Sequence, residues 1–334
     1  MLLMSDEFQL AAFLEASGRD VSEVHSGEWK VAAGRRRDRW GTVSQQAEWI
    51  SLEFPWQAPA SDDPARPLIE LAMRCGALPT PLKFSRAHAE PLFDLRCEVR
   101  NAGDSYDTFG TRHEDQEADH GLQTPLGERL ESLLRTIDQV LDGGLDSLGV
   151  PSEREVADDS SRTQEVPRAS TPGTRSELAR LCDEAGWSCH ERAGGRVAVP
   201  LDVSGLFCEA IVSPHESGRL RVEYTLDGGE RSRVASAASA LFLLRANRVY
   251  RMARLAMTYS PASARTADSG EVAGGLSGVR FVWDVVLPGP AGPADLNAAL
   301  SALSVACRGT VRELQVLAGD RVAREYLAIQ GMVL

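Results

Sequence analysis

The residues best suited to chemistry are two thiols and an imidazole in the second half of the chain, Cys182, Cys189 and His190. They could form a thiol and imidazole pair, or supply three metal ligands. However, Cys182 lies on the apolar stripe of an expected helix, whereas Cys189 and His190 follow it in a loop. Structural roles therefore explain these residues better, and we expect neither a catalytic nor a metal site.

Other motifs that carry chemistry do not occur in the sequence. None of the six cysteines forms a CxxC pair, and there is no GxSxG, HExxH or Walker motif. The glycine-rich stretch 273–278 lacks the lysine of a phosphate-binding loop, and the acidic segment 104–120 has no pattern that would fix metal ligands. We therefore expect no enzyme and no cofactor. An enzyme or small-ligand sensor with an unrecognised pocket remains the alternative.

The net charge of the chain bears on which kinds of partner it could bind. A net charge of −12 over 334 residues disfavours nucleic acids and anionic membranes. The single basic run, 35–37 with Arg39, is interpreted as a solvated turn. The sequence contains neither an apolar run of about 20 residues nor a signal peptide, so we expect a cytoplasmic protein with no membrane contact.

An internal repeat indicates that the chain holds two copies of one domain. Apolar positions match in order along both halves, with insertions only between the matched stretches. The matched pairs are 10–18 with 178–186, 50–54 with 222–226, 93–99 with 281–287, and 126–137 with 296–307. We predict a first domain over 1–149, a flexible linker over 150–175 that is poor in large apolar residues, and a second domain over 176–334.

Apolar periodicity predicts the same α+β order in each copy, namely helix, three strands, helix, two strands, helix. The second copy has the clearer pattern, with a first helix that ends at Gly186 and a last helix that begins at Pro293. The strands expected in it are Arg196–Val203, 206–212, 220–226, 250–259 and Val279–Leu287, with a helix over 235–247.

Particular runs in the second copy resemble the YbjN family, whose fold is that of class I type III secretion chaperones. The family has a leucine-rich helix that ends in Asn and leads into a strand, and this chain is similar at 241–247 (Leu-Phe-Leu-Leu-Arg-Ala-Asn) and at the strand-like 250–256. It is also similar at 285–288, before the last helix, and at 296–307 within that helix. The resemblance covers about residues 176–330 and reaches the first copy only through the repeat.

The resemblance implies a small domain with a curved antiparallel sheet, helices largely on one face, and no active site. Such chaperones are typically acidic, cytoplasmic homodimers that hold a partner polypeptide in extended form. Here the two copies could form that dimer within one chain, or the chain could itself be a homodimer. The implied function is protein binding, and the partner is not identified.

Two tryptophans are the candidate residues for binding a partner. Side chains alternate between the faces of a strand, so Ile50 and Leu52 should point toward the helices and Trp49 away from them, beside Ser51. Trp40 is expected near Trp49. An indole on a polar sheet face indicates a contact with another polypeptide or with the second copy.

Overall fold

The computed structural model is described here for residues 9–47, 49–57, 61–76, 78, 82–86, 92–100, 125–143, 176–203, 205–215, 219–259, 278–287 and 291–332. The predicted linker 150–175, the acidic segment 104–120 and all but the last residue of the glycine-rich stretch 273–278 lie outside these residues. The chain divides into two compact units, which are described separately. Unit 1 holds 1–56 and 94–149, and unit 2 holds 57–93 and 150–334.

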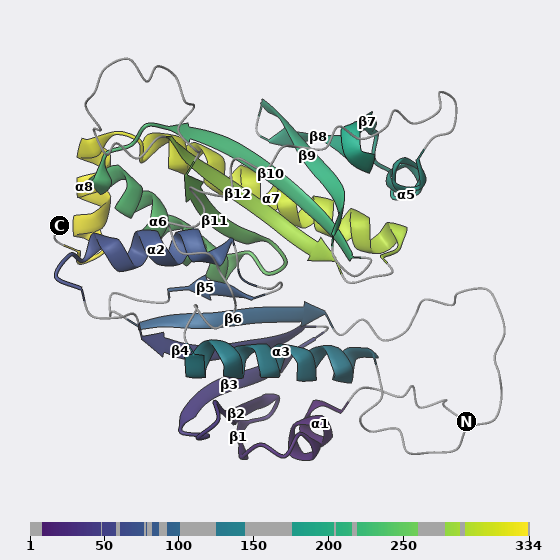
Figure 1. Cartoon of the computed structure of the whole chain (residues 1–334), viewed down its shortest axis with the longest axis vertical. Helices are drawn as coiled ribbons and strands as arrows, with labels where there is room; N and C mark the ends of the chain where they lie inside the picture. The colour runs from purple at the N-terminus through teal and green to yellow at the C-terminus, as the bar shows by residue number, and fades with distance from the viewer. Residues whose placement is uncertain are drawn as a thin grey trace. The chain divides into compact units, whose positions relative to one another are not determined.

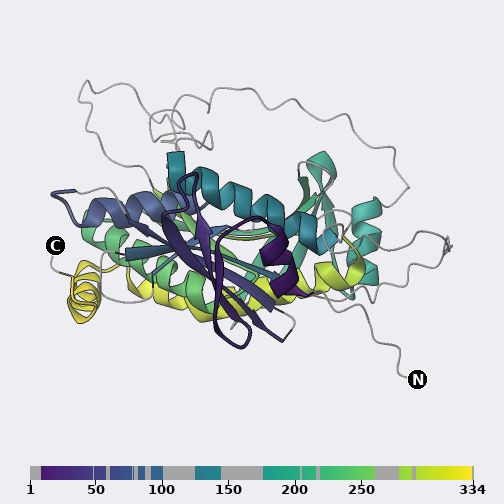
Figure 2. The same ribbon diagram turned by 90° about the horizontal axis from the view of Figure 1, so that it is seen from below.

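The first half of the chain forms a six-stranded sheet in the order β1-β2-β3-β4-β6-β5. Unit 1 contains most of it, with α3 beside the strands (Figures 1 and 2). The elements in unit 1 are α1 (Leu10–Ala16), β1 (Val21–His25), β2 (Glu28–Ala33), β3 (Arg39–Gln46), β4 (Trp49–Gln57, apart from its last residue), β6 (Leu92–Arg100, from its third residue) and α3 (Pro125–Gly143).

Unit 2 contains the second half of the chain together with α2 (Ala65–Cys75) and β5 (Lys83–Ser85). Its sheet has the order β11-β12-β10-β9-β8-β7. The remaining elements are α5 (Glu177–Glu184), β7 (His190–Arg192), the 3₁₀ turn η3 (Ala193–Gly195), β8 (Arg196–Val203), β9 (Leu206–His215), β10 (Arg219–Gly229), α6 (Arg233–Val249), β11 (Arg254–Tyr259), β12 (Val279–Leu287), α7 (Pro293–Val316) and α8 (Asp320–Ile329).

Among the described residues, the two halves share one order of strands and α-helices as far as α3 and α7, and they share one strand order. Read from β7, the second sheet runs β7-β8-β9-β10-β12-β11, which matches β1-β2-β3-β4-β6-β5 strand for strand. Each half has four strands between its first two helices, so the expectation of three was wrong. The missed strands, β1 and β7, lie at sheet edges, and nearly all their side chains are exposed. They therefore lack the apolar alternation that identifies a strand.

Most predicted elements of the second half are confirmed, including the bounds of β8 and β12. The strand expected over 250–259 begins only at Arg254, because the carbonyls of Tyr250, Arg251 and Ala253 accept hydrogen bonds from the Lys83 ammonium instead of joining the sheet. Helix α8 was not predicted. Among the described residues, no helix combines the length and apolar character required to cross a bilayer.

Candidate protein-binding surface

Strand β4 separates an apolar face from a polar one. Ile50, Leu52 and Phe54 are fully buried with the core, whereas Trp49 and Ser51 on the other face are half-buried. The parity predicted for β4 is therefore confirmed. The polar face is where both candidate tryptophans lie.

Trp40 and Trp49 share this face but lie at opposite ends of it. Trp49 is paired with Gln46 across β3 and β4, and Trp40 lies six positions before Gln46 on β3. Strand geometry therefore separates the two indoles by about 20 Å, and the expectation that they are neighbours was wrong. Trp40 is 45% exposed, and Trp49 is half-buried.

The hairpin that leads into Trp40 is fixed to the end of α3 through its backbone. Asp138 accepts from the Gly34 amide at 2.7 Å and forms a two-point ion pair with Arg19. Asp142 accepts from the Arg35 amide at 2.8 Å. A Cβ on Gly34 would lie 2.9 Å from the Asp142 carboxylate, so this close approach requires glycine. The hairpin is thereby held in place while its side chains remain available.

An ion cluster occupies the same face farther along the sheet. Arg96 on β6 pairs with Glu53 on β4 and with Glu98, whose carboxylate lies 2.5 Å from the Arg96 Nε. The Arg96 and Glu98 side chains are almost fully buried, while Glu53 keeps 27% of its surface exposed. A buried charge needs such partners, because burial removes its hydration.

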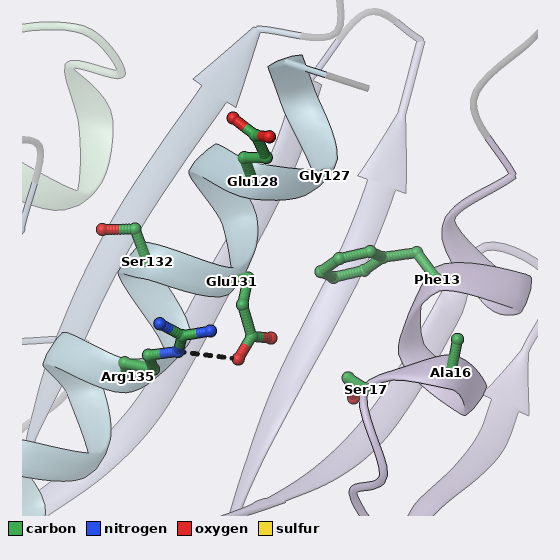
Figure 3. Close-up of a pocket in the computed structure, with 8 residues that line it drawn as sticks. All are labelled: Phe13, Ala16, Ser17, Gly127, Glu128, Glu131, Ser132 and Arg135. Carbon is green, nitrogen blue, oxygen red and sulfur yellow. Dashed lines mark hydrogen bonds and ion pairs between the residues drawn. The ribbon is translucent and has the colours of Figure 1, made fainter. Parts of the chain in front are cut away.

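A shallow pocket lies between α1 and α3 in unit 1 (Figure 3). It encloses about 470 Å³, and the Phe13 ring points into it. Its Glu131 and Arg135 form an ion pair at 3.0 Å, and the Ser17 hydroxyl donates to the Leu14 carbonyl. The polar groups that could bind a ligand here are thus partly engaged by local contacts.

In unit 2, the segment 57–93, which belongs to the first half of the chain, packs against the second half. Helix α2 contacts α6 and β11, and β5 contacts α6. Figure 1 shows α2 beside α6. The approach is close at Gly76, where an added Cβ would lie 3.2 Å from the Ala256 Cβ. Helix α2 and α6 follow the fourth strand of their respective sheets, so equivalent elements meet here.

Two cations make reciprocal contacts across this interface. Lys83, the first residue of β5, donates to the carbonyls of Tyr250 and Arg251, which follow α6, at 2.6 and 2.7 Å. Arg254, the first residue of β11, donates to the carbonyls of Leu78 and Gly76, which follow α2. The first residue of each strand thus binds the backbone that follows the helix of the other half.

Asn247 joins the equivalent strands of the two halves. Its amide donates to the Phe84 carbonyl of β5 at 3.0 Å and to the Leu255 carbonyl of β11 at 2.9 Å. Its carbonyl accepts from the Leu255 amide at 2.7 Å. Because Asn247 is fully buried, its hydrogen-bonding capacity is met by these contacts rather than by water.

A buried carboxylate, Asp284, anchors the cation on the β11 side. It binds Arg254 at 2.8 and 2.6 Å, and Arg221 at 2.9 Å. Burial disfavours the ionised form of Asp284, but the two guanidinium groups outweigh this and hold the pKa of its carboxyl below the ordinary value. Burial likewise opposes the charge on Arg254, and Asp284 offsets it, so the pKa of Arg254 is raised.

The thiols considered for chemistry are dispersed. Cys182 is buried on α5, and the Cys189 thiol donates to the Ala179 carbonyl. His190 belongs to β7, where its Nε2 lies 3.1 Å from Glu209. In the part of the chain that the structure describes, no three His, Cys, Asp or Glu residues are arranged to hold a metal ion.

Another thiol lies beside a phenol in the core of unit 2. The Cys208 thiol lies 3.3 Å from the Tyr224 hydroxyl. Burial, then the contact with Cys208, raises the pKa of Tyr224, and burial also raises the pKa of Cys307. Their raised pKa values keep the Tyr224 hydroxyl and the Cys307 thiol protonated and poorly nucleophilic at neutral pH.

Sequence reasoning missed Lys83, Arg254 and Asn247, which join the two halves in unit 2. Lys83 carried one available signal, because it is one of only two lysines in the chain and lies in an apolar stretch. A scan against protein-family models and a search of curated proteins found no match for this chain.

Proposed function

We propose that this chain is a non-enzymatic protein-binding module, in which the polar face of the first sheet holds a segment of a partner polypeptide. The observation that carries the proposal is the exposure of Trp40, whose indole remains 45% accessible on a sheet face. Exposed aromatic side chains on otherwise polar surfaces often anchor protein partners, because burying them on association gains free energy.

The spacing of the two indoles favours an extended partner. About 20 Å along β3 corresponds to roughly six residues of an extended chain. A segment of that length laid along β3 could contact Trp40 and Trp49 together, whereas a single side chain or a small ligand could not.

We also propose that the halves are two copies of one domain and that they form an internal pseudo-dimer. The matching strand orders and the reciprocal contacts of Lys83 and Arg254 support this. The resemblance to the YbjN family and to class I type III secretion chaperones fits the same proposal. The boundaries 1–149 and 176–334, the linker and the cytoplasmic location stay predictions.

The alternative is a small-ligand sensor, and the pocket between α1 and α3 is the feature that favours it. Its size fits a small molecule. A ligand there would have to compete with the ion pair between Glu131 and Arg135. We rank it below protein binding for this reason.

Co-purification tests the proposed function. A tagged chain isolated gently from its native cells should carry one polypeptide in stoichiometric amount. Trp40→Ala and Trp49→Ala should each reduce that amount without unfolding the chain. Val249→Ala, which removes an apolar side chain that is 71% exposed in unit 2, is the control and should leave it unchanged. Equal recovery from all four proteins would overturn the assignment of this face.

A further inference from the structure

The hairpin between β2 and β3 concentrates positive charge next to Trp40. Residues 35–39 hold four arginines against one aspartate, in a chain whose net charge is −12. All five side chains are exposed, and that of Arg35 is 92% accessible. Within the described residues, the guanidinium groups of Arg36, Arg37 and Arg39 make no hydrogen bond or ion pair. The cluster therefore has charge available for a partner.

The two aspartates of α3 that contact the hairpin do not neutralise its arginine side chains. Asp138 is engaged by Arg19 and by the Gly34 amide, and Asp142 by the Arg35 amide. The Arg35 guanidinium comes no closer than 4.0 Å to Asp142. The contacts that these two aspartates make with the hairpin are mainly to its backbone, and its four arginine side chains remain exposed.

The backbone of the hairpin is held in a defined shape. The Arg37 amide donates to the Gly34 carbonyl at 3.0 Å, which closes a tight turn. Arg37 has φ +51, in the left-handed region that residues with a side chain seldom adopt. Glycine or asparagine would adopt this conformation more readily, so the arginine is placed here against a backbone preference.

The equivalent hairpin in the second half lacks this feature. There, Val203 pairs directly with Leu206, so only two residues connect β8 and β9, and neither is basic. In the first half, Ala33 pairs with Arg39, and the connection contains five residues. The connection between β2 and β3 is thus three residues longer than the one between β8 and β9, and it carries the arginine cluster.

We propose that the hairpin 34–39 selects an acidic polypeptide segment, whose carboxylates contact Arg35, Arg36 and Arg37 while an adjacent apolar side chain packs on Trp40. This inference rests on the proposed function and names the chemistry of its partner. Guanidinium groups bind carboxylates through paired hydrogen bonds. A long nucleic acid would also meet the acidic remainder of the chain, whereas a short acidic segment contacts only the local cluster.

Fluorescence anisotropy with the full chain tests this choice. The probe is a short fluorescein-labelled peptide that repeats Glu-Glu-Leu, and its charge-reversed counterpart repeats Lys-Lys-Leu. We expect saturable binding of the acidic peptide alone, weakening as salt is raised. The comparison probes are a single-stranded oligothymidylate and vesicles that contain phosphatidylserine. Tighter binding of either one, or no binding of the acidic peptide, would overturn the inference.

Matched variants assign the binding to the hairpin. The triple variant Arg35→Gln, Arg36→Gln, Arg37→Asn removes three charges and keeps a residue that tolerates the left-handed conformation. It should weaken peptide binding by about tenfold or more, as should Trp40→Ala. The control Arg66→Gln, Arg180→Gln, Arg312→Gln removes the same charge at exposed sites elsewhere and should change binding less than about twofold. Equal weakening by both triple variants would overturn the inference.

Failure of this inference can be separated from failure of the proposed function. If the Trp40 and Trp49 variants lose the co-purified polypeptide while the arginine triple variant keeps it, the binding face stands and the acidic selectivity is wrong. If none of the variants loses it, the binding face itself is wrong.

Discussion

The two sheets carry charges of opposite sign at matching positions. Aligning β6 with β12 places Leu95 over Trp283, and therefore Arg96 over Asp284. In unit 1, Arg96 is the central cation between Glu53 and Glu98. In unit 2, Asp284 is the central anion between two arginines. Both halves thus hold a paired charge at this position, with opposite sign.

The negative charge of Asp284, where the first half has Arg96, has a structural consequence in unit 2. An anion in β12 can bind Arg254, and Arg254 can then reach the carbonyls of Gly76 and Leu78. A cation in β12 would repel Arg254 and remove this link to the segment that follows α2. We infer that Asp284 serves packing between the halves, whereas the Arg96 cluster serves the sheet that carries Trp49.

The largest expected effect tests this difference directly. Asp284→Asn should reduce the free energy of unfolding by about 3–5 kcal/mol, because it leaves two arginines without their buried counter-charge. Arg96→Gln should cost less, about 1–3 kcal/mol, because the introduced amide can still donate to the buried Glu98 carboxylate and water can solvate Glu53, which is 27% exposed. Urea unfolding of both variants measures these values, and a larger loss from Arg96→Gln would reverse the comparison.

The pH dependence of stability should also show that the charge of Asp284 stabilises the fold. The pKa of Asp284 is lower in the folded chain than in the unfolded one, so its charge stabilises the fold at neutral pH. That stabilisation should decline as the pH falls below about 4, where the unfolded carboxyl begins to bind a proton. The stability difference between the wild type and Asp284→Asn should therefore narrow in acid. A difference that stays constant down to the acid limit of folding would argue against an ionised Asp284.

The two faces of β4 should respond differently to truncation. Leu52→Ala removes a fully buried side chain and should cost about 2–5 kcal/mol through the cavity that it leaves. Trp49→Ala should cost no more than about 1 kcal/mol in the absence of a partner, because the indole is only half-buried and lies off the core face. Denaturant melts compare them, and equal losses would mean that Trp49 is a core residue.

A smaller effect concerns the glycine that brings the hairpin against α3. Gly34 and Gly186 both have positive φ, but only at Gly34 would a Cβ meet a neighbour, the Asp142 carboxylate. Both alanine substitutions should cost about 1 kcal/mol for the backbone conformation, and Gly34→Ala somewhat more for the close contact. Thermal unfolding of the two variants checks this, and a greater loss at Gly186 would contradict the docking of the hairpin.

The smallest effect is expected at the arginine cluster. Arg36→Gln should change the free energy of unfolding by less than about 0.5 kcal/mol, because its side chain is exposed and makes no polar contact in the described part of the chain. A marked loss of stability in the same melts would show that the cluster supports the fold rather than a partner.

Apolar periodicity in the sequence predicted most of the strands and helices that have one buried face. The alternation in β4 identified its buried face, because burial itself creates that pattern. Edge strands β1 and β7 have exposed side chains and left no such pattern. The register that places Trp49 opposite Gln46 depends on the turn between β3 and β4, which periodicity does not determine.

The contacts between the halves could not be predicted for another reason. Lys83 meets Tyr250 across 167 positions, and Arg254 meets Leu78 across 176. The pattern of neighbouring residues in a single sequence does not indicate a contact with a residue so far along the chain. In the sequence, a buried cation is visible only as a charged residue within an apolar stretch.

We propose that the face bearing Trp40 and Trp49 binds a partner and is not needed for folding. The most direct measurement is the dissociation constant of the co-purified polypeptide for the wild type, Trp40→Ala and Trp49→Ala, with the unfolding free energy of each protein measured beside it. We expect the free energy of binding to weaken by about 2 kcal/mol or more while the free energy of unfolding changes by no more than about 1 kcal/mol. Unchanged binding, or a loss of binding that follows a loss of stability, would contradict it.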